Sequence, residues 1–383
     1  MRTSRTAAAA ALVASGLLAV AACGTDNNAA QATSGSTTNG VATTTPSSAA
    51  GSSAAAAGEG CASGSLSAQG STFQANMETQ WSKDFGALCS GAQINYQGTG
   101  SGAGIQAIGN GTADFAGSDV TMKDTERSAA NAACDSDAIT VPITAGGVAI
   151  VYNLKGVSDL KLSAKTLAGI FQGKITKWND PAIAAENTGA TLPATPISVF
   201  YRNDSSGTTS VFTSFLQQVA GSDWALGSGK TVSFFAAAQG AKGSAGVAAG
   251  VSQTAGGITY DEESYAKGQN LPVAAVKGAG SGFAMPTTDA VSKATGEGFT
   301  IVGTGNDLAG KMDYTKMTDG YPISTVSYAI VCSKYKDAAK GGLVKSYLTY
   351  AVTNGQAAAD RLGYAPLPAD LVAKVQASLA AVS

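Results

Sequence analysis

A short polar turn at residues 202–208 (RNDSSGT) combines a permanent positive charge with small hydrogen-bonding side chains. Ser206 is a favourable helix N-cap, so Gly207 and Thr208 would present free backbone N–H groups at the positive end of a helix dipole. Apolar residues at helical spacing follow the turn and predict that helix. They are Val211, Phe212, Phe215, Leu216 and Val219. With the Arg202 guanidinium, these donors predict a site for a small oxyanion, although an ordinary helix start that binds nothing is the alternative.

Three further turns of small polar residues follow predicted strands, at residues 69–73 (QGSTF), 98–104 (GTGSGAG) and 116–119 (AGSD). The carboxyl ends of parallel strands meet at one sheet edge, where ligands bind. The first two turns offer more helix N-terminal amides, and the third ends in the carboxylate of Asp119. Two alternatives stay open: Asp119 as the N-cap of a helix before Met122, and Arg202 as a surface arginine paired with Asp204.

The absence of histidine and the scarcity of charge narrow the available chemistry. The chain has 383 residues, no histidine, 13% charged residues and a net charge of −2. A Ser-His-Asp triad, a Cys-His pair and histidine-based zinc motifs are therefore excluded. We expect no enzymatic activity, no metal and no cofactor. We also expect no nucleic-acid partner, because a nucleic-acid surface needs a basic stripe.

Short apolar strands alternate with helical segments after residue 61, which predicts an α/β fold with mainly parallel sheets. Strands are expected near residues 66–68, 94–97, 113–116, 139–152 and 197–201. Helices are expected near residues 122–133, 164–171 and 181–186. One further stripe at helical spacing is expected in the core. It consists of Phe73, Met77, Trp81, Phe85 and Leu88.

The start of the chain has the pattern of an export signal. Arg2 and Arg5 precede an apolar run over residues 7–22, which is shorter than the roughly 20 residues of a membrane span. The run ends in residues 20–23 (VAAC), similar to a bacterial lipobox. We therefore expect a lipoprotein signal peptide at residues 1–22 and lipidation of Cys23, with an ordinary signal peptide as the alternative. Residues 23–61, rich in Ala, Ser, Thr and Gly, predict a flexible tether.

Four more cysteines lie after Cys23, and an even count in an exported protein suggests two disulfides out of three possible connectivities. Cys61 and Cys89 each stand shortly before an expected strand. Parallel neighbouring strands would place both at one sheet edge, so we pair them. The pair Cys134–Cys332 then follows by elimination. These cysteines show no Cys-x-x-Cys spacing, so the sequence gives no indication of a zinc site.

The chain resembles the PstS-type phosphate-binding lipoproteins of bacterial phosphate ABC transporters, and its actinobacterial members in particular. The resemblance covers most of the chain after about residue 66 and rests on segments in a fixed order. They are residues 70–73 (GSTF), 95–105 (NYQGTGSGAGI), 114–119 (DFAGSD), 178–181 (WNDP), 202–215 (RNDSSGTTSVFTSF) and 321–323 (YPI). Two positions depart from the family pattern. Gln74 stands where many members have proline, and residues 243–246 (GSAG) replace a Gly-Asn-Asp/Glu-Gly stretch; neither is expected to touch the site.

This resemblance implies a two-lobed periplasmic-binding-protein-like fold of type II, with hinge strands between the lobes. Lobe 1 would span residues 62–144 and 323–383, and lobe 2 residues 145–322. The phosphate-binding residues implied are Thr72, Phe73, Ser101, Asp119, Arg202, Ser206, Gly207 and Thr208. Asp119 would accept a hydrogen bond from the ligand's own proton, and Asp204 would orient Arg202.

The resemblance also implies a function and its partners. A monomer, lipid-anchored on the extracytoplasmic face of the cell membrane, would bind inorganic phosphate and deliver it to the permease and ATPase of an importer. Alternatives of the same class are a binder of arsenate or a phosphonate, or a phosphate sensor or surface adhesin without transport. An exported phosphatase is the alternative from another class, but neither Ser101 nor Ser206 has an adjacent base in the sequence.

Overall fold

The structure is a computed structural model that describes residues 61–383. The expected signal peptide at residues 1–22, the lipidated Cys23 and the tether up to residue 60 lie outside the described residues. Within residues 61–383, no helix has both the length and the apolar character needed to cross a membrane.

The strands of the described range form one large sheet and a separate hairpin. The order along the sheet is β2-β1-β3-β12-β4-β8-β6-β7; β9 and β13 also pair with β4, and β5 pairs with β9. The hairpin consists of β10 and β11. The strands are β1 (Gly64–Gly70), β2 (Ala92–Gly98), β3 (Phe115–Ser118), β4 (Ala138–Tyr152), β5 (Lys161–Ser163), β6 (Ser198–Arg202), β7 (Gln239–Ala241), β8 (Gly257–Glu262), β9 (Val273–Lys277), β10 (Phe299–Ile301), β11 (Gly310–Met312), β12 (Ser324–Cys332) and β13 (Tyr364–Ala365).

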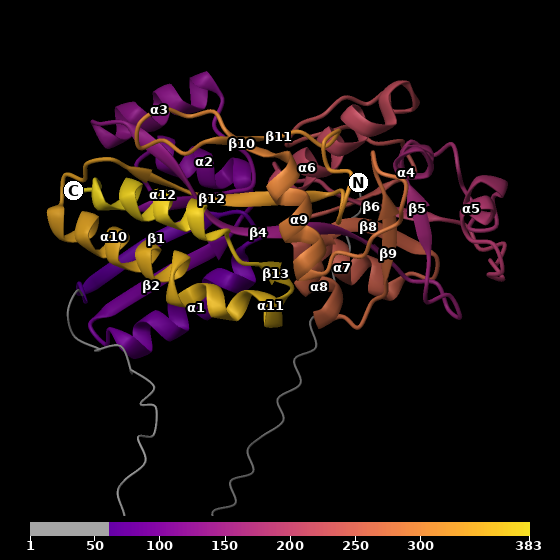
Figure 1. The fold of residues 1–383 in the computed structure, drawn as a ribbon, viewed down its shortest axis with the longest axis horizontal. Coiled ribbons are helices and arrows are strands. Elements are labelled where there is room, and N and C mark those ends of the chain that lie inside the picture. Colours follow the sequence, from indigo (N-terminus) through magenta and orange to yellow (C-terminus); the bar gives the residue numbers. More distant parts are fainter. Residues whose placement is uncertain (1–60) are drawn as a thin grey trace, which may run out of the picture. The chain divides into compact units, whose positions relative to one another are not determined.

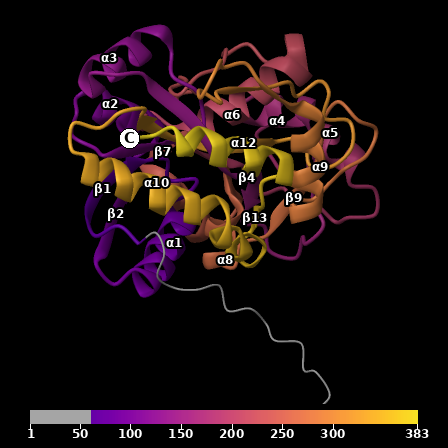
Figure 2. The same cartoon turned by 60° about the vertical axis from the view of Figure 1, so that its left-hand side comes forward.

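Helices connect most of these strands, as an α/β fold requires. They are α1 (Ala75–Leu88), α2 (Ser101–Gly109), α3 (Asp124–Cys134), α4 (Ala164–Phe171), α5 (Pro181–Glu186), α6 (Gly207–Phe215), α7 (Gly243–Gln253), α8 (Glu263–Gly268), α9 (Thr288–Gly298), α10 (Ala338–Val352), α11 (Ala359–Leu362) and α12 (Ala369–Ala380). Figure 2 shows α10 and α12 lying together, with α10 near β1.

The sheet has a parallel group of strands at each end and antiparallel pairs between them. β1 pairs in parallel with β2 and β3, and β6 pairs in parallel with β7 and β8. The long strands β4 and β12 join the two groups and run antiparallel to each other through the middle of Figure 1. Within β4, residues up to Gly147 pair with β12, whereas Val148 to Tyr152 pair with β8. The α/β prediction is confirmed.

All fifteen residues of β4 are buried, which explains why its sequence is mostly apolar. The core stripe predicted before Cys89 is mostly correct, because Met77, Trp81 and Phe85 are buried on α1. Phe73 is also buried but precedes the helix. The prediction is wrong for Leu88, the last residue of α1, which is 52% exposed.

Both predicted cysteine pairs are bonded in the structure. Cys61 is bonded to Cys89, where β1 and β2 begin side by side. Cys134, the last residue of α3, is bonded to Cys332, the last residue of β12. The second bond spans 198 residues and ties the C-terminal part of the sheet to an early helix.

Candidate functional site

The polar turn before α6 lies at the carboxyl end of β6, as predicted. The side chain of Ser206 caps the helix by accepting a hydrogen bond from the Thr209 backbone N–H at 3.1 Å. The backbone N–H of Ser206 itself donates to the Lys230 carbonyl at 2.9 Å. Gly207 and Thr208 are the first residues of α6, so the helix supplies no acceptor for their N–H groups. These amides stand at the positive end of the α6 dipole.

Arg202 is a buried residue, only 2% exposed, which rules out the surface-arginine alternative. Its Nε and Nη2 atoms donate to the two carboxylate oxygens of Asp204 at 2.7 and 2.5 Å. Burial raises the pKa of Asp204, but the hydrogen bonds and the charge of Arg202 outweigh that effect and hold the pKa below its ordinary value. The bidentate pair therefore fixes the guanidinium plane.

The remaining terminal nitrogen of Arg202 points across to the turn after β1. Nη1 donates to the Thr72 hydroxyl at 2.9 Å and to the Ser244 hydroxyl at 3.3 Å. These two hydroxyls also hydrogen-bond to each other at 2.8 Å. One cation is thus connected to residues from the ends of β1 and β6 and from the start of α7.

Asp119 lies directly after β3 and is 3% exposed. Its Oδ1 accepts hydrogen bonds from the hydroxyls of Ser71 at 2.5 Å and Ser327 at 2.7 Å, and its Oδ2 accepts from Ser101 at 3.1 Å. Burial raises the pKa of Asp119 above its ordinary value, and the three hydroxyls and Arg202 offset this only in part. Asp119 is not a helix cap, because α3 starts at Asp124 with Lys123 as its N-cap.

The start of α6 lies against Asp119 and Ser101. A Cβ atom built on Gly207 would lie 2.3 Å from the Ser101 hydroxyl and 2.5 Å from Oδ2 of Asp119. Beside this contact, the Gly102 backbone N–H donates to the Ser205 carbonyl at 2.9 Å. A helix terminus with free donors therefore faces a carboxylate held by hydroxyl groups.

Two more predicted residues complete the cluster. Phe73 is fully buried; its ring packs edge-on against Tyr364, and its carbonyl accepts a hydrogen bond from the Tyr364 hydroxyl at 2.5 Å. The Thr208 hydroxyl is buried and has no hydrogen-bond partner within the described part of the chain. A buried polar atom without a partner commonly marks the place of an unseen water or ligand.

Several residues of this cluster escaped prediction, and one expectation about them is wrong. The segments at Gln74 and at residues 243–246 were expected not to touch the site. Ser244 instead bonds both Arg202 and Thr72, so the expectation is wrong for that segment. Gln74 bonds none of the predicted contact residues directly, but it accepts a hydrogen bond from Ser327, the partner of Asp119. Ser71 lies in the segment at residues 70–73 (GSTF), so its place in the site was predictable from the sequence. Ser327 lies in a buried strand and gives no sequence signal.

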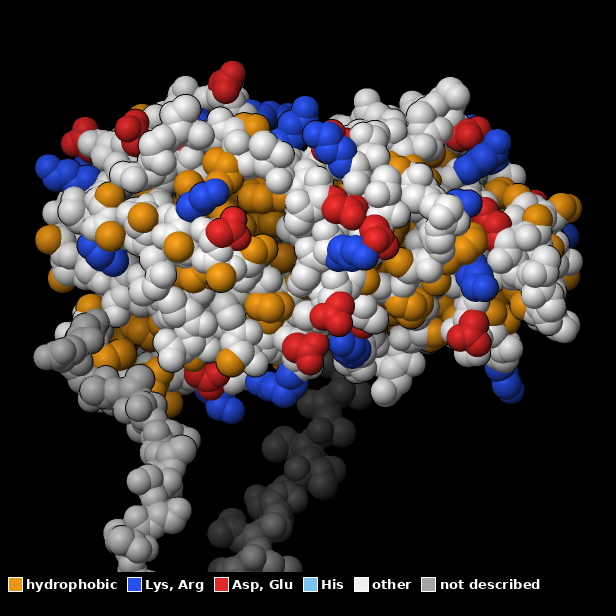
Figure 3. Space-filling model, viewed as in Figure 1, with side chains coloured by type: hydrophobic (Ala, Val, Ile, Leu, Met, Phe, Trp, Pro, Cys, Tyr) orange, Lys and Arg blue, Asp and Glu red, His pale blue; other side chains and the backbone are white. Residues whose placement is uncertain are grey.

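Charged side chains of both signs are mixed on the surface of the protein. On the face shown in Figure 3, Lys and Arg side chains are mixed with Asp and Glu, without a large area of one sign. Among residues 61–383, no group of His, Cys, Asp and Glu side chains could hold a metal ion. At the site itself, Arg202 and oriented N–H and O–H groups are available to attract an anion.

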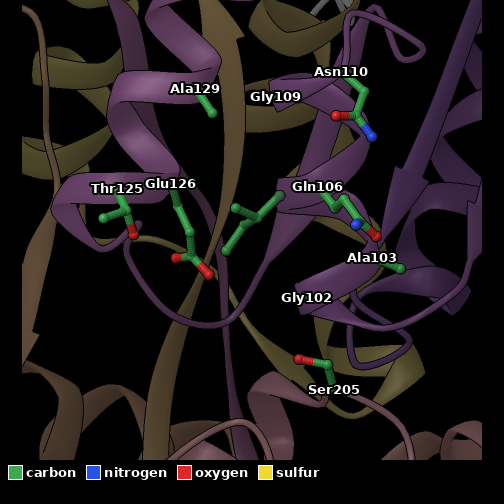
Figure 4. A pocket seen from close by; sticks show the side chains of 10 residues that line it. Gly102, Ala103, Gln106, Gly109, Asn110, Thr125, Glu126, Ala129 and Ser205 are labelled. Atoms are coloured by element: carbon green, nitrogen blue, oxygen red, sulfur yellow. The ribbon is translucent and has the colours of Figure 1, made fainter.

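A cavity of about 500 Å³ opens next to the site, between α2 and α3. Figure 4 shows Glu126 of α3 pointing into it and Ser205 on its opposite side. Glu126 forms an ion pair with Lys230, whose carbonyl holds the N–H of Ser206. This ion pair links α3 to the loop that supports the start of α6.

The sequence of the chain is similar to those of known proteins. Residues 55–354 match the PBP superfamily domain. The phosphate-binding protein PstS 3 of Mycobacterium leprae (strain TN) is 41% identical over 325 residues, which cover 83% of this chain and 87% of that protein. The phosphate-binding protein PstS 2 of Mycobacterium tuberculosis (strain ATCC 25618 / H37Rv) is 40% identical and covers 85% and 92%.

Solved structures show the same fold. The periplasmic phosphate-binding protein PfluDING, bound with phosphate at pH 8.5, superimposes with a TM-score of 0.66 at 26% identity, covering 82% of this chain and 93% of that one. A human phosphate-binding apolipoprotein superimposes with a TM-score of 0.64 at 27% identity, with the same coverage.

Proposed function

Because the chain belongs to the PstS family of phosphate-binding proteins, we propose that it binds inorganic phosphate where the α6 terminus meets the turns after β1 and β3. The observation that carries this proposal is the meeting of Gly207 with Asp119: free helix amides and one fixed cation lie around a single buried acceptor. The ligand would be held by backbone N–H groups, hydroxyls, one arginine and one aspartate. The contact residues are Thr72, Phe73, Ser101, Asp119, Arg202, Ser206, Gly207 and Thr208.

Asp119 would make the site prefer an anion that carries a proton. Phosphate keeps at least one proton at neutral pH, and this proton can be donated to the carboxylate, whereas sulfate has none to donate. A buried carboxylate facing an aprotic anion would be left unpaired and repelled, which costs about 1–3 kcal/mol or more. The three hydroxyls that donate to Asp119 favour its ionised, accepting form.

Ligand binding would involve closure of two lobes, at residues 62–144 with 323–383 and at residues 145–322. The change of partner along β4 after Gly147 supports a hinge near residue 145. Contacts across the proposed cleft support a closed arrangement. Besides the Arg202–Thr72 bond, the Asn76 side chain donates to the Ser264 hydroxyl at 2.5 Å. Release would then require reopening of the lobes.

The protein would act outside the cell membrane, as a monomer anchored through a lipid on Cys23 and carried on the tether at residues 23–61. From there it would deliver phosphate to the permease and ATPase of an ABC importer. Relatives named as phosphate-binding proteins support a binding role without bond chemistry. The absence of histidine also argues against an exported phosphatase.

Calorimetric titration of the purified protein with phosphate, sulfate and arsenate tests the proposal. We expect tight binding of phosphate, weak or no binding of sulfate, and binding of arsenate, which is nearly isosteric with phosphate. Equal affinity for sulfate would contradict the role of Asp119. Turnover of a chromogenic phosphate ester would contradict the binding role and favour the phosphatase. Import measured with and without the gene would separate a transporter subunit from a sensor.

A further inference from the structure

Glu78 is a buried carboxylic acid that none of the contacts proposed above uses. It lies on α1 between the core residues Met77 and Trp81, and it is fully buried. A carboxyl group among apolar side chains is costly unless it is hydrogen-bonded or protonated. Its position beside α10, where Figure 1 shows the two helices as neighbours, therefore calls for a physical reason.

The two oxygens of Glu78 have different partners. Oε2 accepts a hydrogen bond from the Tyr347 hydroxyl of α10 at 2.6 Å, and Oε1 accepts from Nε2 of Gln74 at 3.0 Å. Tyr96 on β2 is the other titratable group that faces Glu78. Burial raises the pKa of Glu78 to about 7, although the hydrogen bonds from Tyr347 and Gln74 lower it.

Gln74 and Ser327 connect Glu78 to Asp119. The Ser327 hydroxyl lies 2.5 Å from Oε1 of Gln74 and 2.7 Å from Oδ1 of Asp119. Gln74, Ser327 and both carboxylates are buried, so the chain of hydrogen bonds lies away from bulk solvent. Among residues 61–383, the charged side chain that acts on Asp119 is Arg202, and the titratable hydroxyls of Tyr96, Tyr265 and Tyr328 also interact with it electrostatically.

The single proton of the Ser327 hydroxyl can serve only one acceptor at a time. When Glu78 is ionised, Gln74 donates to it through Nε2, and Oε1 of Gln74 takes the Ser327 proton. When Glu78 is protonated, it can donate to Oε1 of the turned amide, and Nε2 then donates to the Ser327 oxygen. The Ser327 proton is then released toward Asp119.

We infer that Glu78 is a positioning residue for Asp119, acting through Gln74 and Ser327, and that it makes anion binding depend on pH. This inference rests on the proposed function. An ionised Asp119 that accepts the ligand's proton needs the donor from Ser327, so binding favours protonated Glu78. The negative charge of the ligand acts in the same direction. Affinity should therefore fall as Glu78 loses its proton.

Phosphate titrations at pH values from 6 to 8.5 test the inference by comparing the unsubstituted protein with Glu78→Gln. The ligand's own ionisation is the same for both proteins and cancels in the comparison. If binding shifts the pKa of Glu78 by one unit, the two pH profiles diverge by about tenfold in Kd. We expect the unsubstituted protein to lose affinity relative to the variant as pH rises. Parallel profiles would overturn this inference alone, and absence of phosphate binding by the unsubstituted protein would overturn the proposed function as well.

Two further variants separate the hydrogen-bonded path from other effects. Gln74→Met removes the path but keeps an ionisable Glu78, so its profile should approach that of Glu78→Gln; a profile like that of the unsubstituted protein would overturn the path. Glu186→Gln is the control. Glu186 is the last residue of α5, and its carboxylate accepts hydrogen bonds from Ser163 and Thr166, which take no part in the proposed site, so its removal should leave the pH profile unchanged.

Discussion

Replacement of Gly207 by alanine separates the space at the start of α6 from its hydrogen-bonding groups. The substitution keeps the backbone N–H and adds one methyl group. That group would lie 2.3 Å from the Ser101 hydroxyl and 2.5 Å from Oδ2 of Asp119, where an ordinary contact is 3.4–4 Å. Alanine is also the better helix former, so the helix itself should gain stability.

The effect on binding follows from this overlap. The start of α6 must move away from Asp119 by roughly 1 Å, and forced overpacking of this kind costs about 1–3 kcal/mol. In the proposed open form Gly207 and Asp119 separate, so the cost falls on the closed, liganded form alone. We therefore expect phosphate binding to weaken by roughly 5- to 150-fold. The ligand-free protein should keep its melting temperature or gain slightly.

Calorimetry for the affinity and thermal unfolding for the stability measure the two effects. Gly296→Ala is a matched control, because Gly296 lies within helix α9 and a Cβ built there meets no atom within 4 Å. The control should gain stability without any change in affinity. Unchanged phosphate affinity of Gly207→Ala would refute the close approach of α6 to Asp119 in the bound protein.

Asp119→Asn should lower the ratio of phosphate to sulfate affinity by about 10- to 100-fold, because the amide can donate a hydrogen bond to an aprotic anion. Calorimetry with both anions measures this ratio, and an unchanged ratio would show that Asp119 does not determine the selectivity. Arg202→Lys keeps the charge but loses the bidentate pair with Asp204, so phosphate binding should weaken by about 10-fold or more. An unchanged affinity would show that Arg202 does not contact the phosphate. Glu126→Gln should weaken binding by about two- to fivefold through loss of the Lys230 ion pair, and the loss should shrink in high salt. Finally, the folded protein holds the Glu78 proton more tightly than the unfolded chain, since burial raises the pKa from 4.5 to about 7. As the pH rises through this range, the free energy of unfolding of the unsubstituted protein should therefore fall relative to that of Glu78→Gln, by at most about 3 kcal/mol. Urea unfolding of both proteins at pH 5 and pH 8 measures this change. The same difference in free energy of unfolding at both pH values would show that Glu78 does not titrate in this range.

Local features of the fold were predictable from the sequence. The helices at Ala164–Phe171 and Pro181–Glu186 and the buried strand β4 follow from apolar periodicity and capping residues. The strand order was not predictable, because β12 lies between β3 and β4 although it is far from both in sequence. That pairing depends on packing between distant segments, and the apolar pattern of a single strand does not predict its neighbours in the sheet.

The same division holds for the site. The Ser206 cap and the Arg202–Asp204 pair join near neighbours in the chain, and turn chemistry predicts such contacts. Ser244 and Ser327 are ordinary serines whose roles arise only when distant segments pack together. Glu78 lies beside apolar residues that predict a core-facing side of α1, and the sequence pattern gives no separate indication that its acid group is buried.

The position of β12 between β3 and β4 also sets an order of events during synthesis. Both neighbours are made well before Ser324, the first residue of β12, so each has one unpaired edge until nearly the whole chain is available. That insertion brings Cys332, the last residue of β12, next to Cys134 at the end of α3. This part of the sheet therefore closes late, and formation of the disulfide reports that β12 has taken its place between β3 and β4.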